Sequence, residues 1–334
     1  MNDFLFGILE WINGWVGNYG WAMIVFTVLI RLVLTPLDVK SRISMRKTSK
    51  LQPQLAALQK KYANDKEKLN QKTAELYKKE HINPLSSCLP LLLTWPILIA
   101  VFGAMRMAAN RELLQQVTQL LNMEKPTLEP WLWIKNLWMP DSLFSPAYPD
   151  LGTMRQISAA EWLQWFRGLD QAHLPALLQG MGLTEAHFGN DQLAATIQSI
   201  QNALAVGNPA YAEALTVPQG MSINLLITQV NLVKDYNGLM LLPILSAVSQ
   251  IAMTKLTGGA QAGAEQGSAA TTGKFMMWFF PIFSLVLCFS YSSAFALYWV
   301  AGNLVSMVQT LVINKVLDSK EKNAAPVAGE GTVK

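Results

Sequence analysis

Arg31 is a single cation inside an otherwise apolar run that extends from Trp21 to Pro36. A charged side chain at the centre of a hydrocarbon layer costs roughly 2.5–3.5 kcal/mol on insertion-based scales, and one kept at that cost usually faces a bundle interior or a water-filled cavity. Snorkelling to the interface is difficult, because apolar residues both precede and follow Arg31. Pairing is also difficult, because the other apolar runs contain no Asp or Glu. We therefore expect Arg31 to be a functional, water-exposed arginine.

Two threonines share the helix face of Arg31. Thr27 and Thr35 lie one helical turn on either side of it, so the three side chains point the same way if the run is helical. A polar face of this kind could border a hydrophilic passage. The alternative is that each hydroxyl bonds back to its own helix, as threonines in membrane helices often do.

Composition predicts a membrane protein. Of the 334 residues, 51% are hydrophobic and only 14% are charged, whereas soluble domains average about 25% charged residues. Cys88 and Cys288 both lie in apolar segments and are expected to be buried thiols, neither a disulfide nor a metal site. The three histidines are scattered and form no ligand cluster. The sequence therefore predicts no metal and no cofactor.

Five segments have the apolar character of transmembrane helices. They are residues 19–37, 85–105, 239–256, 275–291 and 294–313. The third and fourth are short and suit a locally thin membrane or an upright helix. Residues 1–18 are apolar and Trp-rich but interrupted by Glu10 and Asn13, which favours an amphipathic helix in the membrane interface.

Charge predicts the orientation. Residues 38–82 carry twelve Lys/Arg against five Asp/Glu, a net of +7, whereas residues 106–238 carry seven against eleven, a net of −4. Lys/Arg-rich loops stay in the cytoplasm. We therefore expect the N-terminus outside, the segment 106–238 outside, and both the loop 257–274 and the tail 314–334 inside.

The cytoplasmic segment 38–82 is predicted to be a basic helical hairpin. Apolar residues recur at helical spacing on both sides of Asn64-Asp65, a dipeptide typical of turns. The basic outer face holds the candidate docking residues Lys47, Lys50, Lys60, Lys61, Lys66 and Lys68. This charge could serve only topology and contact with anionic headgroups. It could also bind a nascent chain or ribosomal RNA, and the two roles are compatible.

The outer segment contains a predicted helical insertion at about residues 150–220. Ser158 and Glu161 have the spacing of a capping box. Asp191 is expected to cap a helix that ends near Gly207. The insertion could be a spacer that packs on the bundle, or a site for a partner.

The chain resembles the YidC/Oxa/Alb family of membrane protein insertases. The resemblance is carried by Gly20-Trp-Ala-Met-Ile-Val-Phe-Thr-Val-Leu-Ile-Arg31-Leu-Val-Leu-Thr-Pro36-Leu, by Leu51-Gln-Pro-Gln-Leu-Ala-Ala-Leu-Gln-Lys-Lys-Tyr62 and by Asn83-Pro-Leu-Ser-Ser-Cys-Leu-Pro90-Leu-Leu-Leu-Thr-Trp-Pro96. It continues in Trp133-Ile-Lys-Asn-Leu137, Leu242-Pro-Ile-Leu-Ser-Ala-Val-Ser-Gln250, Phe280-Pro-Ile-Phe283 and Leu297-Tyr-Trp-Val-Ala-Gly-Asn303. An arginine in the first span, a basic hairpin and an Asn-Pro-Leu entry to the second span form a specific combination.

The resemblance implies an all-α polytopic membrane protein whose five spans surround a hydrophilic groove that holds Arg31. The groove would be open to cytoplasm and lipid and closed outside. Besides Thr27 and Thr35, its candidate lining residues are Thr94, Trp95, Gln250, Tyr298, Trp299 and Asn303. Gln250 and Trp299 match family groove positions, although Tyr298 and Trp299 could instead belong to an interfacial aromatic belt. A translocating segment with acidic or polar flanks would be attracted to Arg31, and its apolar part would enter lipid.

The implied function is a bacterial plasma-membrane insertase and chaperone, not an enzyme. Its expected partners are nascent membrane proteins and the lipid bilayer, with the ribosome, the signal-recognition machinery and the Sec translocon as further candidates and no nucleotide. The chain departs from some relatives, because it carries neither a large soluble domain before the first span nor a lipobox cysteine, and its first residues are not expected to form a signal peptide. An assembly scaffold and a small anion transporter remain alternatives. A transporter usually shows internal repeats, which this sequence lacks.

Overall fold

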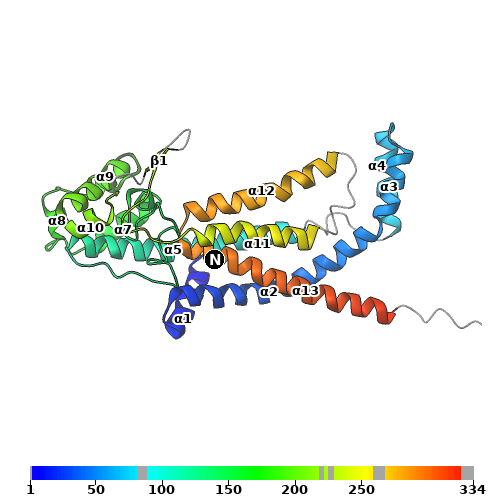
Figure 1. Ribbon diagram of the computed structural model, residues 1–334, viewed down its shortest axis with the longest axis horizontal. Helices are drawn as coiled ribbons and strands as arrows, with labels where there is room; N and C mark the ends of the chain where they lie inside the picture. The colour runs from blue at the N-terminus through cyan, green and yellow to red at the C-terminus, as the bar shows by residue number, and fades with distance from the viewer. Residues whose placement is uncertain (1, 81–88, 218–221, 225–228, 259–267, 325–334) are drawn as a thin grey trace, which may run out of the picture. The chain divides into compact units, whose positions relative to one another are not determined.

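The computed structural model describes residues 2–80, 89–217, 222–224, 229–258 and 268–324. The chain is mostly helical, as expected (Figure 1). Its long helices are α2 (Tyr19–Lys50), α5 (Leu89–Leu121), α11 (Leu241–Gly258), α12 (Ser268–Ser290) and α13 (Ser293–Ala324). A short antiparallel pair, β1 (Ser222–Asn224) and β2 (Gln229–Asn231), was not predicted.

The chain divides into two compact units, and each long helix contributes residues to both. The first unit comprises Met1–Phe26, Ala100–Ser246 and Ser284–Trp299; the second comprises Thr27–Ile99, Ala247–Phe283 and Val300–Lys334. Among the described residues, α2 and α13 are long and apolar enough to cross a membrane, while α11 and α12 contain the shorter apolar helices Leu241–Leu256 and Trp278–Ser290. The five-span arrangement therefore remains a prediction.

Helix α2 extends beyond the predicted span. It continues through Pro36 to Lys50, so the segment 38–82 begins with the last turns of α2. The hairpin itself is made by α3 (Gln52–Lys61) and α4 (Lys66–Lys79), which contact one another in the second unit. The turn predicted at Asn64-Asp65 is confirmed, because Asp65 caps α4 and accepts a hydrogen bond from the Lys68 N–H at 3.0 Å.

The first unit holds the N-terminal helix and the insertion at residues 150–220. Helix α1 (Asn2–Val16) buries one apolar face and exposes Trp11 and Trp15. The insertion is helical, as predicted. Its elements are α6 (Leu151–Met154), α7 (Ala159–Gly168), α8 (Ala176–Gln179), the 3₁₀ helix η2 (Glu185–Phe188), α9 (Asn190–Gly207) and α10 (Pro209–Ala214).

Local signals predicted the helix ends of the insertion only in part. The capping box of Ser158 and Glu161 opens α7, as expected. Helix α9 ends at Gly207, also as expected, but the proposed cap was wrong: Gly189 occupies the N-cap position, and Asp191 lies inside the first turn. There its carboxylate interacts favourably with the positive end of the helix dipole, but it accepts no capping hydrogen bond.

A buried amide pair joins two distant loops of the first unit. Asn237 is fully buried, and its Nδ2 contacts the carbonyls of Asn136 at 2.9 Å, Met139 at 3.1 Å and Pro140 at 2.9 Å. Its Oδ1 accepts from the Asn136 N–H at 2.8 Å. One side chain therefore satisfies backbone groups about a hundred residues away along the chain.

The substitution Asn237→Ala is expected to destabilise the first unit by about 2–4 kcal/mol, because it leaves buried backbone groups without partners. Thermal unfolding of the purified protein in detergent should show the transition lowered by several degrees. The matched control is Asn122→Ala, because the Asn122 side chain is exposed and makes no hydrogen bond within the described structure. Equal transition temperatures for the two variants would contradict this role of Asn237.

Candidate functional site

Polar residues line one side of α2 within the second unit. Thr27, Arg31, Thr35, Asp38 and Arg42 recur every three or four residues and so share a helix face. Helix α13 carries a matching row at Gly302, Asn303, Ser306, Gln309 and Thr310. Hydrogen bonds connect the two rows, so the helices meet along polar faces. We call this contact the polar seam.

The guanidinium of Arg31 packs against the backbone of α13. A Cβ atom placed on Gly302 would lie 3.3 Å from Nη2 of Arg31 and 3.8 Å from Cγ2 of Thr27. Contacts near 3.3 Å are tighter than those that side chains normally make, so a larger residue would displace the guanidinium. The lack of a side chain at Gly302 therefore leaves the space in which the Arg31 guanidinium packs against α13.

Gln309 fixes the backbone of α2 at the level of Arg31. Its Nε2 donates to the Arg31 carbonyl at 3.0 Å and to Oγ1 of Thr35 at 2.7 Å. The Thr35 hydroxyl in turn donates to the same Arg31 carbonyl at 3.0 Å. The backbone bond considered for Thr35 from the sequence is therefore present, and the same hydroxyl also accepts from α13.

The three arginines of α2 differ in their partners. Arg42 donates to Oγ1 of Thr310. Arg46 donates from Nη2 to the Asn314 carbonyl at 3.0 Å, and its Nη1 lies 2.7 Å from Oδ1 of Asp318. Arg31, which is partly buried, forms no hydrogen bond or ion pair through its guanidinium with any residue that the structure describes. Asp38, on the same helix, interacts with it electrostatically.

Asn303 connects α13 to α11. Its Nδ2 donates to Oγ of Ser249 at 3.0 Å, and both side chains are buried. Ser249 therefore makes the contact on α11, while its predicted neighbour Gln250 is half-buried and accepts through its backbone carbonyl from Thr254 at 2.8 Å.

The remaining predicted groove residues lie on α13 and α5. Tyr298 and Trp299 lie on α13 but belong to the first unit, where the Trp299 ring lies 5.8 Å from that of Phe295. Thr94 and Trp95 lie on α5, and their side chains fall outside the described structure. The six docking lysines are exposed: Lys47 and Lys50 on α2, Lys60 and Lys61 on α3, and Lys66 and Lys68 on α4.

The sequence also matches known proteins. Residues 11–321 match the family described as 60Kd inner membrane protein. The chain belongs to this family. The match covers nearly the whole chain, so the resemblance seen in the sequence is confirmed.

Similar proteins bear the name Membrane protein insertase YidC. The protein from Fusobacterium nucleatum is 46% identical over 106 residues, which cover 32% of this chain and 52% of the relative. The protein from Thioalkalivibrio sulfidiphilus is 40% identical over 141 residues, 42% of this chain and 23% of the relative. The protein from Leptospira interrogans is 40% identical over 135 residues, which cover 40% of this chain and 19% of the relative. The matched stretch thus spans half of the first relative's length and about a fifth of the other two.

Two seam residues of this member of the 60Kd inner membrane protein family were not singled out from the sequence. Gly302 and Gln309 both contact Arg31, yet neither has a local pattern that points to α2. Their signal is spacing: a glycine and an amide seven residues apart inside an apolar run lie on one helix face. Small and polar residues on one face are typical of contacts between membrane helices.

The packing of Arg31 against Gly302 predicts a coupled effect. The substitution Gly302→Leu should destabilise the protein by about 1–3 kcal/mol, because the added side chain overlaps the guanidinium. In an Arg31→Ala background the same change should cost less, because the overlapping group is gone. A double-mutant cycle from thermal unfolding in detergent measures the difference. If Gly302→Leu destabilised the protein equally with and without the Arg31 side chain, the two residues would not be in energetic contact.

Proposed function

We propose that this protein is a membrane protein insertase and chaperone. It transfers hydrophobic segments of nascent proteins from the cytoplasm into the lipid bilayer and catalyses no chemical step. Membership of the 60Kd inner membrane protein family and the names of the relatives support this proposal. The structural observation that carries it is the Arg31 guanidinium, which is held in an apolar helix by its neighbours yet has all its donors available within the described structure.

In the proposed mechanism Arg31 attracts the acidic or polar flank of an entering segment. Two unit charges 4 Å apart attract by about 1 kcal/mol in water but by about 4 kcal/mol at the effective dielectric of a protein surface. Bound at Arg31, the flank brings the adjoining apolar stretch beside lipid, where hydrophobic transfer completes insertion. Arg31, Thr27, Thr35, Gln250 and Asn303 are proposed to border this hydrophilic groove, with Thr94, Trp95, Tyr298 and Trp299 completing it.

The proposed topology has five spans, with the N-terminus outside and the C-terminus in the cytoplasm. It rests on the charge imbalance between residues 38–82 and 106–238. Nascent membrane proteins are the proposed substrates and the bilayer is the acceptor. The ribosome, the signal-recognition machinery and the Sec translocon are proposed partners on the cytoplasmic side and in the membrane.

Removing the Arg31 charge is expected to abolish insertion of clients with acidic flanks. In a bacterial host depleted of its own insertase, wild type and Arg31→Lys should restore insertion of a single-span client, measured by protease protection. Arg31→Ala should reduce it roughly tenfold or more, since 1.4 kcal/mol of lost attraction is a factor of ten.

The matched control is Arg46→Ala, which removes a cation from the same helix but one that is already paired with Asp318. This variant should insert the client normally, because the Arg46 guanidinium is already bound by Asp318 and Asn314 and is not offered to a client. Full rescue by Arg31→Ala for every client would show that insertion does not require the charge of Arg31. Failure of wild type on all clients would instead favour an assembly scaffold, whose function does not need this charge.

The exposed lysines of the hairpin are proposed to dock the ribosome. Changing Lys60, Lys61, Lys66 and Lys68 to Gln should weaken binding of purified ribosomes in a sedimentation assay, and wild-type binding should fall steeply between 50 and about 200 mM salt. The control is the pair Lys78→Gln and Lys79→Gln, which lies at the other end of the exposed face of α4. Equally strong binding in both sets of variants and at both salt concentrations would show that the hairpin charge does not bind ribosomes and serves only to orient the chain in the membrane.

A further inference from the structure

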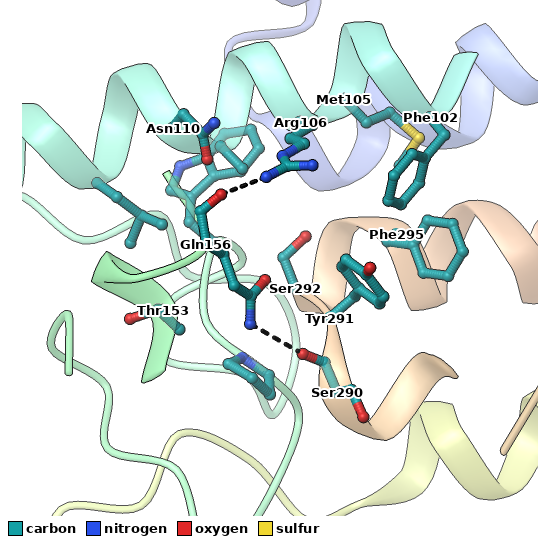
Figure 2. Close-up of a pocket in the computed structure, with 14 residues that line it drawn as sticks. Phe102, Met105, Arg106, Asn110, Thr153, Gln156, Ser290, Tyr291, Ser292 and Phe295 are labelled. Carbon is teal, nitrogen blue, oxygen red and sulfur yellow. Dashed lines mark hydrogen bonds between the residues drawn. The ribbon is translucent and has the colours of Figure 1, made fainter. Parts of the chain in front are cut away.

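A small cavity lies within the first unit beside the start of α13. It is lined by α5, by the segment between α6 and α7, and by the residues that join α12 to α13 (Figure 2). Its volume is about 40 Å³, which is room for about three water-sized groups. A compact polyatomic ligand would fit, whereas a drug-sized molecule would not enter completely.

One wall of this cavity is aromatic. The ring of Phe102 on α5 lies 5.2 Å from that of Phe295 on α13 and 5.2 Å from that of Tyr291, in edge-to-face arrangements. Such pairs are mutually stabilising and hold a fixed apolar surface. The ligand must therefore tolerate an apolar neighbour on one side.

Another part of the lining presents hydrogen-bond donors. Arg106 is the one charged residue among those that line the cavity, which include no carboxylate. Its Nη2 donates to the Gln156 carbonyl, and Gln156 donates to the Ser290 carbonyl at 3.4 Å, so the guanidinium is held in place (Figure 2). Arginine has five N–H donors, so most remain available to a ligand.

A serine adds to the donors of the cavity. Trp138 also lines it but is only 1% exposed, and its indole nitrogen is fully enclosed, so it contributes apolar surface and no donor to a ligand there. Ser292 contributes a hydroxyl that points toward the side on which Arg106 lies (Figure 2).

The field of α13 adds to this preference. The helix begins at Ser293, directly after the cavity residues Tyr291 and Ser292. Its first N–H groups are already bonded, Ser293 to the Met139 carbonyl at 2.9 Å and Ala294 to the Leu137 carbonyl at 2.9 Å. The helix therefore acts through the positive end of its dipole, which stabilises negative charge nearby.

We infer that this cavity binds a phosphate group, either that of a phospholipid headgroup or free phosphate. A guanidinium and a hydroxyl offer several donors to the oxygens of one phosphate. The aromatic wall suits the glycerol and first methylenes of a lipid. On the proposed limits of the spans, 85–105 and 294–313, the cavity lies at headgroup level. The inference rests on the membrane location of the protein and not on its insertase activity.

The test uses the full chain, purified and delipidated in detergent, and measures bound ligand by native mass spectrometry. The probes are dihexanoyl-phosphatidylglycerol and, separately, inorganic phosphate. Wild type should bind one tightly held probe molecule, and Arg106→Gln should bind it at least about tenfold more weakly, because hydrogen bonds to charged groups are the strong ones. The matched control, Arg111→Gln, changes an arginine of the same helix that pairs with Glu10 and does not line the cavity.

A second variant, Ser292→Ala, removes the hydroxyl and should weaken binding severalfold; thermal unfolding of each variant reports whether the fold is kept. Loss of lipid binding in Arg106→Gln but not in Arg111→Gln supports the site, and equal occupancy by inorganic phosphate would identify free phosphate as its ligand. Equal binding by both arginine variants, or no binding of either probe by wild type, would overturn the inference.

Discussion

The constraint on which the second unit depends is the cost of keeping the Arg31 cation in an apolar helix. That cost falls if the arginine lies beside polar groups, so α2 and α13 must both present polar residues along the line where they touch. Gly302 leaves space for the guanidinium, and Gln309 ties the carbonyl of Arg31 to α13. Interhelical hydrogen bonds of this kind contribute only about 0.6–2 kcal/mol each. Here they hold the backbone of Arg31 in position and leave the hydrogen-bond donors of its guanidinium unused.

The first unit supplies the groups that begin two of the long helices. The opening N–H groups of a helix have no partner within it and need acceptors from elsewhere. At the start of α2, Glu129 accepts from the Tyr19 N–H at 2.9 Å and Asn18 accepts from the Gly20 N–H at 3.1 Å. At the start of α11, Asp141 accepts from Leu242 at 2.7 Å, and a side chain on Gly238 would collide with that carboxylate. The loop that follows α5 thus defines where two of the long helices begin.

The features predicted correctly from the sequence are those with a local signal. The common helix face of Thr27, Arg31 and Thr35, the turn at Asp65 and the capping box at Ser158 all follow from spacing within a few residues. Gln309 and Asn237 were not identified, because their partners lie 278 and 101 residues away and nothing nearby in the chain points to them. The cap of α9 was misplaced by two residues, since Asp191 and Gly189 both suit a helix start and only tertiary packing chooses between them. Periodicity locates polar faces well, but it does not identify which faces meet.

Asp38 explains how Arg31 can remain both charged and available. It follows Arg31 by seven residues on the same face, an axial rise of about 10.5 Å, and so sits two turns away. The electrostatic attraction between the two groups offsets part of the cost of the buried cation. A carboxylate within hydrogen-bond reach would attract more strongly, but it would also occupy the guanidinium and leave nothing to bind an incoming chain. Arg42, on the far side of Asp38, shares the same carboxylate electrostatically and is held by Thr310. The face therefore alternates in charge, and Arg31 is its one cation whose guanidinium makes no hydrogen bond within the described structure.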